Sequence, residues 1–241
     1  MTDPRDRIAL AADLPLPAAL ELYARVSSNV GYVKVGLSLF VEHGPAAVAS
    51  FRERGARVFL DLKLHDIPNT VELAAARAAE LGVSLLTIHA SGGTAMVQAA
   101  VRGARKGAET RGLPAPKILA VTALTSLSDA DASAIGWRGS AADAVKRLAE
   151  LAKVAGADGV VCSPGEASAL RAALGPDFFL CTPGIRSATD AKGDQARAES
   201  ATFAVRAGAD LLVVGRPLHG AVDPIAAARA LHAEVAAASP G

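Results

Sequence analysis

The sequence places a carboxylate, an ammonium group and a second carboxylate close together, at Asp61, Lys63 and Asp66. The apolar run 56–60 just before them has the β-branched and aromatic content of a buried strand. Because side chains alternate between the two faces of a strand, we expect Asp61 and Lys63 to point the same way. Pro68 follows and is expected to open a helix, since proline suits the first helical position. The three charges should therefore stand at the end of a strand.

Two interpretations of these charges are open. Opposite charges on one face of an apolar strand are costly to bury unless they are paired or used in chemistry. A lysine held between carboxylates stays protonated, so it can stabilise developing negative charge or give up a proton. The alternative is a structural ion pair between Asp61 and Lys63, with Asp66 merely preceding a helix. The positions of other polar residues favour chemistry.

Eight short apolar runs alternate with helical patterns along the chain, with no linker, composition shift or low-complexity segment. Such alternation predicts a parallel sheet covered by helices, and eight units are the number for a closed (β/α)8 TIM barrel, here a single α/β domain over residues 1–241. An open, doubly wound sheet is the competing architecture. The expected strands are 8–12, 32–36, 56–63, 85–89, 117–124, 159–163, 178–181 and 210–214. The expected helices are 17–28, 38–54, 68–81, one from 92–93 to 106, 141–155, 166–174, one ending at 207, and 224–238, with a small helical piece in the loop after the fifth strand.

Charged residues gather where these strands end, which is where barrels of this kind form their active sites. They include Asp13, Lys34 and His89 besides the first three. The last two strand ends, 182–186 (TPGIR) and 214–216 (VGR), each combine glycine with arginine. Barrels commonly bind phosphate at this place, where glycine lets the backbone approach and arginine supplies paired donors. The alternative there is turn geometry with solvated arginines.

The composition narrows the function classes. The chain has 25 basic and 24 acidic residues and only 4% aromatic residues, which gives no support for nucleic-acid binding. The two cysteines, Cys162 and Cys181, form no C-x-x-C pair, so a reduced, cytoplasmic setting is expected. We expect no signal peptide, because the apolar run after the charged N-terminus is too short, and no transmembrane helix, because no run of about 18 apolar residues occurs.

The segment 61–70, DLKLHDIPNT, resembles the signature of the orotidine 5′-phosphate decarboxylase family. The similarity extends, in the family's order along nearly the whole chain, to 32–36 (YVKVG), 121–126 (VTALTS), 182–186 (TPGIR), 193–195 (GDQ) and 214–216 (VGR). One small departure is the pair of alanines before Asp13, where the family usually has leucine or a similar residue.

The resemblance implies decarboxylation of orotidine 5′-phosphate to UMP in a homodimer, with neither metal nor cofactor. Lys63 would give a proton to C6 within a network that includes Asp61, Asp66 and Lys34. Asp66, Ile67 and Thr70 would reach the partner's site, and Asp13 with Lys34 would hold the ribose hydroxyls. The implied substrate contacts are Asp13, Lys34, Asp61, Lys63, Ile67, Thr70, Thr125 near the pyrimidine, Pro183, Arg186, Gln195, Gly215 and Arg216.

Three other functions remain open. A related decarboxylase acting on a sugar phosphate would share the D-x-K-x-x-D string but use a divalent metal. A non-catalytic nucleotide-phosphate binding barrel would bind UMP without turnover. A phosphosugar isomerase would need a paired acid and base instead of the charged row. The polar loop 187–196 is either a lid over the phosphate or an ordinary surface loop, and His65 and His89 are expected to be structural.

Overall fold

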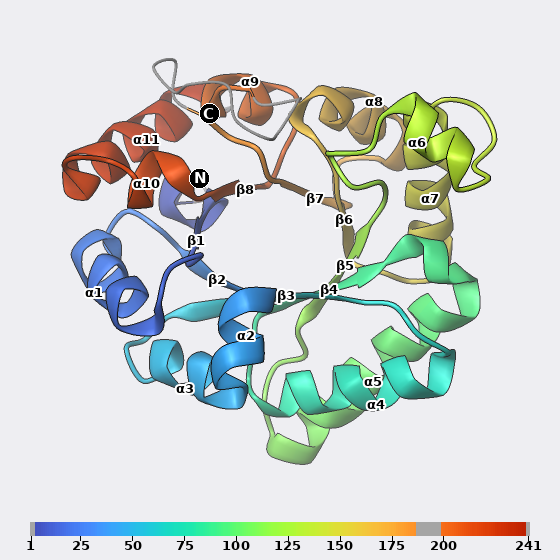
Figure 1. Ribbon diagram of the computed structural model, residues 1–241, viewed down its shortest axis with the longest axis horizontal. Coiled ribbons are helices and arrows are strands. Elements are labelled where there is room, and N and C mark those ends of the chain that lie inside the picture. The colour runs from blue at the N-terminus through green and yellow to red at the C-terminus, as the bar shows by residue number, and fades with distance from the viewer. Residues whose placement is uncertain (1–2, 187–198, 240–241) are drawn as a thin grey trace.

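Eight parallel strands form a closed barrel in the computed structural model, which describes residues 3–186 and 199–239 (Figure 1). The strands follow one another around the barrel in chain order, and β8 pairs with β1 through Ile8 and Leu212. The closure confirms the predicted (β/α)8 barrel and rules out the open sheet. The strands are β1 (Ile8–Ala11), β2 (Tyr32–Gly36), β3 (Arg57–Leu64), β4 (Leu85–His89), β5 (Lys117–Val121), β6 (Gly159–Val161), β7 (Phe179–Thr182) and β8 (Leu211–Val214).

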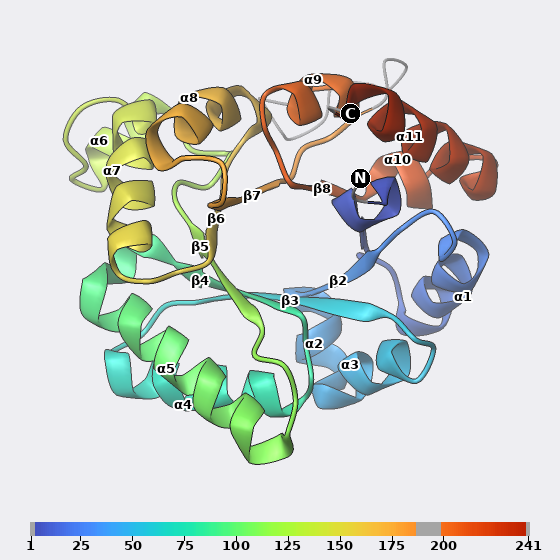
Figure 2. The same cartoon turned by 180° about the vertical axis from the view of Figure 1, so that it is seen from behind.

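Helices surround the barrel on its outside, as the two opposite views show (Figures 1 and 2). They are α1 (Leu16–Val26), α2 (Leu37–His43), α3 (Pro45–Arg52), α4 (Pro68–Glu80), α5 (Gly93–Arg111), α6 (Asp129–Ala134), α7 (Ala141–Val154), α8 (Pro164–Leu174), α9 (Ala201–Arg206), α10 (Arg216–His219) and α11 (Pro224–Ala238), with 3-10 turns η1 (Pro4–Arg7) and η2 (Ala90–Gly92). Within the described ranges, no helix has the length and apolar character needed to cross a membrane.

Two helical predictions were wrong in detail, and one short helix was not predicted. The single helix expected over 38–54 is two helices, because Gly44 takes a positive φ of 57° and Pro45 then starts α3 without an N–H. The helix expected to end near 106 continues to Arg111, where Gly112 in the left-handed conformation ends it. The four-residue α10 after β8 was not predicted.

The core has two layers, because the strand side chains alternate in direction. One set, which includes Leu10, Leu60 and Leu180, packs with the surrounding helices. The alternate set forms a second cluster that includes Phe59 and Leu85, and in a closed barrel this set fills the interior. Toward the C-terminal strand ends, the side chains that face the barrel interior are polar. A polar site therefore lies directly above the apolar interior cluster.

Helices α4 and α5 approach closely because α5 carries two glycines on the shared face. A Cβ atom at Gly103 would lie 2.1 Å from the carbonyl oxygen of Glu72, and one at Gly107 would lie 2.1 Å from that of Ala76. Side chains at these positions would therefore push the two backbones apart.

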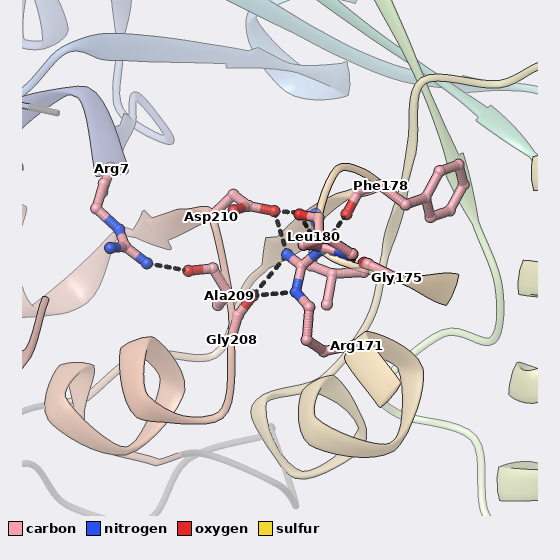
Figure 3. A network of polar contacts seen from close by, with 9 residues as sticks. Arg7, Arg171, Gly175, Phe178, Leu180, Gly208, Ala209 and Asp210 are labelled. Carbon is pink, nitrogen blue, oxygen red and sulfur yellow. Dashed lines mark hydrogen bonds and ion pairs between the residues drawn. The ribbon is translucent and has the colours of Figure 1, made fainter. Parts of the chain in front are cut away.

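Polar contacts join the N-terminal ends of β7 and β8 at the opposite end of the barrel (Figure 3). The Arg171 guanidinium lies 2.6 Å from the Asp210 carboxylate, which also accepts from the Leu180 N–H at 2.8 Å. Nearby, Arg7 donates to the Ala209 carbonyl at 2.5 Å and to Ser239 near the C-terminus at 3.1 Å. Arg171 also donates to the carbonyl oxygens of Gly175, Pro176, Phe178 and Gly208.

Candidate active site

Asp61 is the centre of the candidate site. Its two carboxylate oxygens each lie 2.8 Å from Lys63 Nζ, and one of them lies 3.7 Å from Lys34 Nζ. The Thr87 hydroxyl donates to the Asp61 carboxylate at 2.8 Å. The side chains of Asp61 and Lys34 are each only 12% exposed, so the charges of both are largely removed from water. This geometry confirms that Asp61 and Lys63 converge at the end of β3.

The charges around Asp61 decide its ionisation. Burial alone would raise the pKa of its carboxyl group. The positive charges of Lys34 and Lys63, with hydrogen bonds from Lys63 and Thr87, outweigh burial and hold the pKa below its ordinary value. Asp61 is therefore a carboxylate whose negative charge is fixed between two ammonium groups.

The backbone at Lys63 departs from a regular strand. Lys63 has a φ of 51°, which makes it the one non-glycine residue with positive φ in the described parts of the chain. The pairing of β3 with β4 shifts register between Leu60 and Leu64, so Lys63 lies in an irregular stretch. Its N–H donates to the Thr87 hydroxyl at 2.9 Å. The expectation of a simple alternating strand was wrong at this residue, although the side chain still reaches Asp61.

Lys34 extends the row of charges toward β1. Its Nζ donates to Asp13 at 3.1 Å, and Asp13 is half exposed at the mouth of the barrel. A Cβ atom at Gly36 would lie 2.9 Å from the Lys34 Nζ and 3.2 Å from the Asp13 carboxylate, so a side chain there would displace the Lys34 ammonium group from its present position. The row thus alternates in sign from Asp13 through Lys34 and Asp61 to Lys63.

The residues predicted to reach a partner subunit follow the charged row in sequence and are exposed. Asp66 and Thr70 are exposed, and Ile67 is 67% exposed immediately before α4. The Asp66 carboxylate accepts from the Ile67 N–H at 2.6 Å. Their exposure leaves them accessible to a second chain, and their role in a dimer stays a prediction.

Two histidines stand beside Lys63. The ring centroids of His65 and His89 lie 5.3 Å apart with a tilt of 38°. Burial first, and then the neighbouring His65 and Lys63, lower the pKa of His89, while Asp61 acts in the opposite direction. His89 is half-buried and His65 is exposed, so His65 is a rim residue.

The described residues that were predicted to bind phosphate lie just after two paired strands. Strands β7 and β8 are neighbours, with Thr182 opposite Leu212. Beyond β7, the Arg186 N–H donates a hydrogen bond to the Glu199 carbonyl at 3.1 Å. The remaining predicted residues lie close to strand ends: Pro183 just after β7, the partly buried Thr125 after β5, Gly215 after β8 and the exposed Arg216 at the start of α10. Gln195 and the proposed lid lie outside the described residues.

Sequence reasoning missed Thr87 and Gly36. Thr87 is completely buried, and its hydroxyl contacts both Asp61 and the Lys63 backbone. The signal for it was the strand periodicity, since Thr87 lies two residues beyond Leu85, which faces the barrel interior. Gly36 had no comparable signal, because its close contacts involve Lys34 and Asp13 from different positions of the chain.

Comparisons with known proteins agree on one family. The model of the orotidine 5′-phosphate decarboxylase / HUMPS family matches residues 6–231. An orotidine 5′-phosphate decarboxylase from Anaeromyxobacter dehalogenans is 57% identical over 95% of this chain and 98% of its own length. One from Moorella thermoacetica is 49% identical over 96% of this chain and 92% of its own. The crystal structure of orotidine 5′-phosphate decarboxylase from Lactobacillus acidophilus superposes with a TM-score of 0.84 at 38% identity, covering 95% of this chain and 99% of that one.

Proposed function

The chain belongs to the orotidine 5′-phosphate decarboxylase / HUMPS family, and from this premise we propose that it is the enzyme that converts orotidine 5′-phosphate to UMP. The observation that carries the proposal is the alternating row of Asp13, Lys34, Asp61 and Lys63 at the C-terminal end of the barrel. A row of charges in which Lys34 and Asp61 are largely buried is costly to keep unless it performs chemistry.

In the proposed mechanism, the bond between C6 of the pyrimidine and its carboxylate breaks and CO2 leaves. The electron pair of that bond stays on C6 as a carbanion. The Lys63 ammonium group stabilises this developing charge and then gives C6 a proton, which produces UMP and a neutral lysine. Solvent returns a proton to Lys63 before the next turnover.

Asp61 holds the Lys63 ammonium group in place in this proposal. Its carboxylate contacts the Lys63 ammonium group through both oxygens at 2.8 Å. A carboxylate whose pKa is lowered remains negatively charged at neutral pH, so the attraction persists under working conditions. Asp13 and Lys34, linked at 3.1 Å, would hold the ribose hydroxyls as acceptor and donor.

The ends of β7 and β8 would bind the phosphate. Arg186, Gln195 and Arg216 supply polar donors, and Gly215 lets the backbone approach the anion. Pro183 would line the same side and Thr125 the pyrimidine. Binding energy from the phosphate, remote from C6, would help to assemble the site.

The proposed working unit is a homodimer in the cytoplasm. Asp66, Ile67 and Thr70 would enter the partner's site, which agrees with their exposure beside the charged row. The cytoplasmic setting rests on the two buried cysteines, Cys162 and Cys181, which are both free thiols.

The first experiment follows the ultraviolet absorbance of orotidine 5′-phosphate with purified protein, with and without EDTA. We expect the substrate absorbance to disappear at the same rate in both. Inhibition by EDTA would instead support a metal-dependent decarboxylase. Unchanged absorbance with retained UMP binding would show a non-catalytic binding barrel and overturn the proposal.

Replacement of the lysine tests the proposed proton donor. We expect Lys63→Ala to lower kcat by at least about 1,000-fold, because both charge stabilisation and proton donation are lost. The thermal unfolding midpoint should show that the barrel remains folded. Lys146→Ala, which removes an exposed lysine from α7, is the matched control and should retain full activity. Near-normal turnover by Lys63→Ala would refute the mechanism.

A further inference from the structure

We propose that Thr87 is a positioning residue that aligns Asp61 and Lys63 for the reaction, an inference that rests on the proposed decarboxylation. Thr87 lies in β4, next to the strand that carries both charges, and is 0% exposed. Its hydroxyl lies 2.8 Å from the Asp61 carboxylate and 2.9 Å from the Lys63 backbone nitrogen. One side chain thus contacts both members of the central ion pair.

The chemistry of the two partners fixes the direction of both hydrogen bonds. A backbone N–H can only donate, so the Thr87 hydroxyl oxygen must accept from Lys63. The hydroxyl proton is then directed at Asp61, which accepts it as an ionised carboxylate. The contact therefore selects the charged form of Asp61 and restrains the oxygen atoms that hold Lys63 Nζ.

The backbone at Lys63 needs this support. A φ of 51° is unfavourable for a residue with a Cβ atom, and the register shift removes Lys63 from the regular pairing of β3 with β4. The Thr87 hydroxyl supplies an acceptor for its N–H at this irregular point. Without it the partly buried N–H would lose this acceptor, and the backbone would relax and carry the Lys63 side chain with it.

Thr87→Val removes the hydroxyl and keeps the shape of the side chain. A displacement of about 1 Å in a reacting group can cost about 100-fold in rate, so we expect kcat to fall by about 10- to 100-fold. KM should change by less than about threefold, because the proposed phosphate contacts follow β7 and β8, away from β4. Thr87→Ser retains the hydroxyl and should restore kcat to within about threefold of the wild type.

Two comparisons separate positioning from packing. Thr122→Val removes another buried threonine hydroxyl, one that donates at 3.1 Å to the Val161 carbonyl, and should leave kcat unchanged. If Thr87→Val does not fold, Thr87→Ser and Thr87→Ala, which differ by the hydroxyl oxygen, provide the same test. Equal kcat in the serine and alanine variants would overturn the inference.

The pH profile gives a second readout that a packing defect would not move. The Thr87 hydrogen bond is one of the contacts that lower the pKa of Asp61. Its loss should therefore move the acid limb of kcat/KM to higher pH. An unchanged kcat and pH profile in a folded Thr87→Val enzyme would overturn the role of Thr87 alone, whereas an inactive wild-type protein would overturn the proposed function itself.

Discussion

Asp61 shows how one buried carboxylate can be held ionised by its neighbours. It has two ammonium groups and one hydroxyl as partners, from three adjacent strands. Burial is the largest single influence on its pKa, and the charges of Lys34 and Lys63 with the hydrogen bonds from Lys63 and Thr87 together outweigh it. The consequence reaches beyond catalysis, because a shifted pKa links this residue to the stability of the whole barrel.

Acid titration of stability should show that link. The folded-state pKa of Asp61 lies below the ordinary value of 3.8. Ionised Asp61 therefore contributes stability above that pH, and the contribution is lost as the pH falls through the folded-state pKa. The difference in free energy of unfolding between wild type and Asp61→Asn should thus shift against the wild type below about pH 4.

Urea unfolding at several pH values measures this difference. Asp177→Asn, which removes an exposed carboxylate from the loop before β7, controls for the general loss of one negative charge. A wild-type advantage that grew on acidification would contradict the ionised state assigned to Asp61.

The residues of the charged row could be predicted from the sequence, but their support could not. Asp13, Lys34, Asp61 and Lys63 follow recognisable strands, and charge at a strand end is visible in the sequence. Thr87 is an ordinary strand-forming residue, and the positive φ of Lys63 follows from a register shift between β3 and β4. Both depend on the pairing of strands, which periodicity within one strand does not describe.

At the scale of elements, the bounds of helices depend on contacts that the sequence pattern does not contain. The helix 68–81 was predicted almost as found because Pro68 and Gly82 mark its ends. Helix α5 was predicted too short: its expected end at residue 106 lies directly before Gly107, and glycine is unfavourable inside a helix. Its glycines instead face α4 and allow close packing.

The close packing of α4 on α5 can be tested with two alanines. Gly103→Ala and Gly107→Ala should each lower the free energy of unfolding by about 1 to 3 kcal/mol, because the added methyl group meets a backbone carbonyl. Gly165→Ala in α8 meets no atom within 4 Å and should be neutral or stabilising by up to about 1 kcal/mol. Stability equal to wild type in both α5 variants, measured in urea, would show that the helices can separate at little cost.

At the scale of the whole molecule, a network of structural polar contacts and the proposed active site lie at opposite ends of the barrel. The charged row lies at the C-terminal strand ends, and the contacts of Arg171 and Arg7 lie at the N-terminal ends of β7 and β8 (Figure 3). Arg7 also reaches Ser239, so these contacts tie the two ends of the chain together beside the closing pair of strands, β1 and β8.

Loss of Arg171 should affect stability and spare catalysis. Arg171→Met leaves the partly buried Asp210 carboxylate without its cation and several carbonyls without a donor, which should cost about 3 kcal/mol. Arg102→Met breaks a surface pair with Glu72, in which the arginine side chain is 59% exposed, and should cost less than about 1 kcal/mol. Both variants should retain the wild-type kcat below their unfolding temperature, and a large loss of kcat in folded Arg171→Met would show that the two ends are coupled.

The proposed dimer is tested by mixing inactive chains. Asp66→Ala and Lys63→Ala should each be inactive alone, because each removes a charge from both sites of a homodimer. If Asp66 serves the partner's site, unfolding and refolding the two together should restore some activity, since a mixed dimer contains one intact site. Sustained inactivity of a mixture shown to contain mixed dimers would place Asp66 and Lys63 in the same chain's site.

The left-handed backbone of Lys63 has a consequence for how this protein could change over time. Glycine adopts a φ of 51° without strain, and asparagine does so more easily than lysine. The fold by itself would therefore be more stable with glycine or asparagine at position 63, because neither residue is strained there and neither places a cation in the site. In a related chain that is selected for folding but no longer for activity, we expect this lysine to be replaced early. A chain that retains the lysine is therefore expected to be one in which the activity is still under selection.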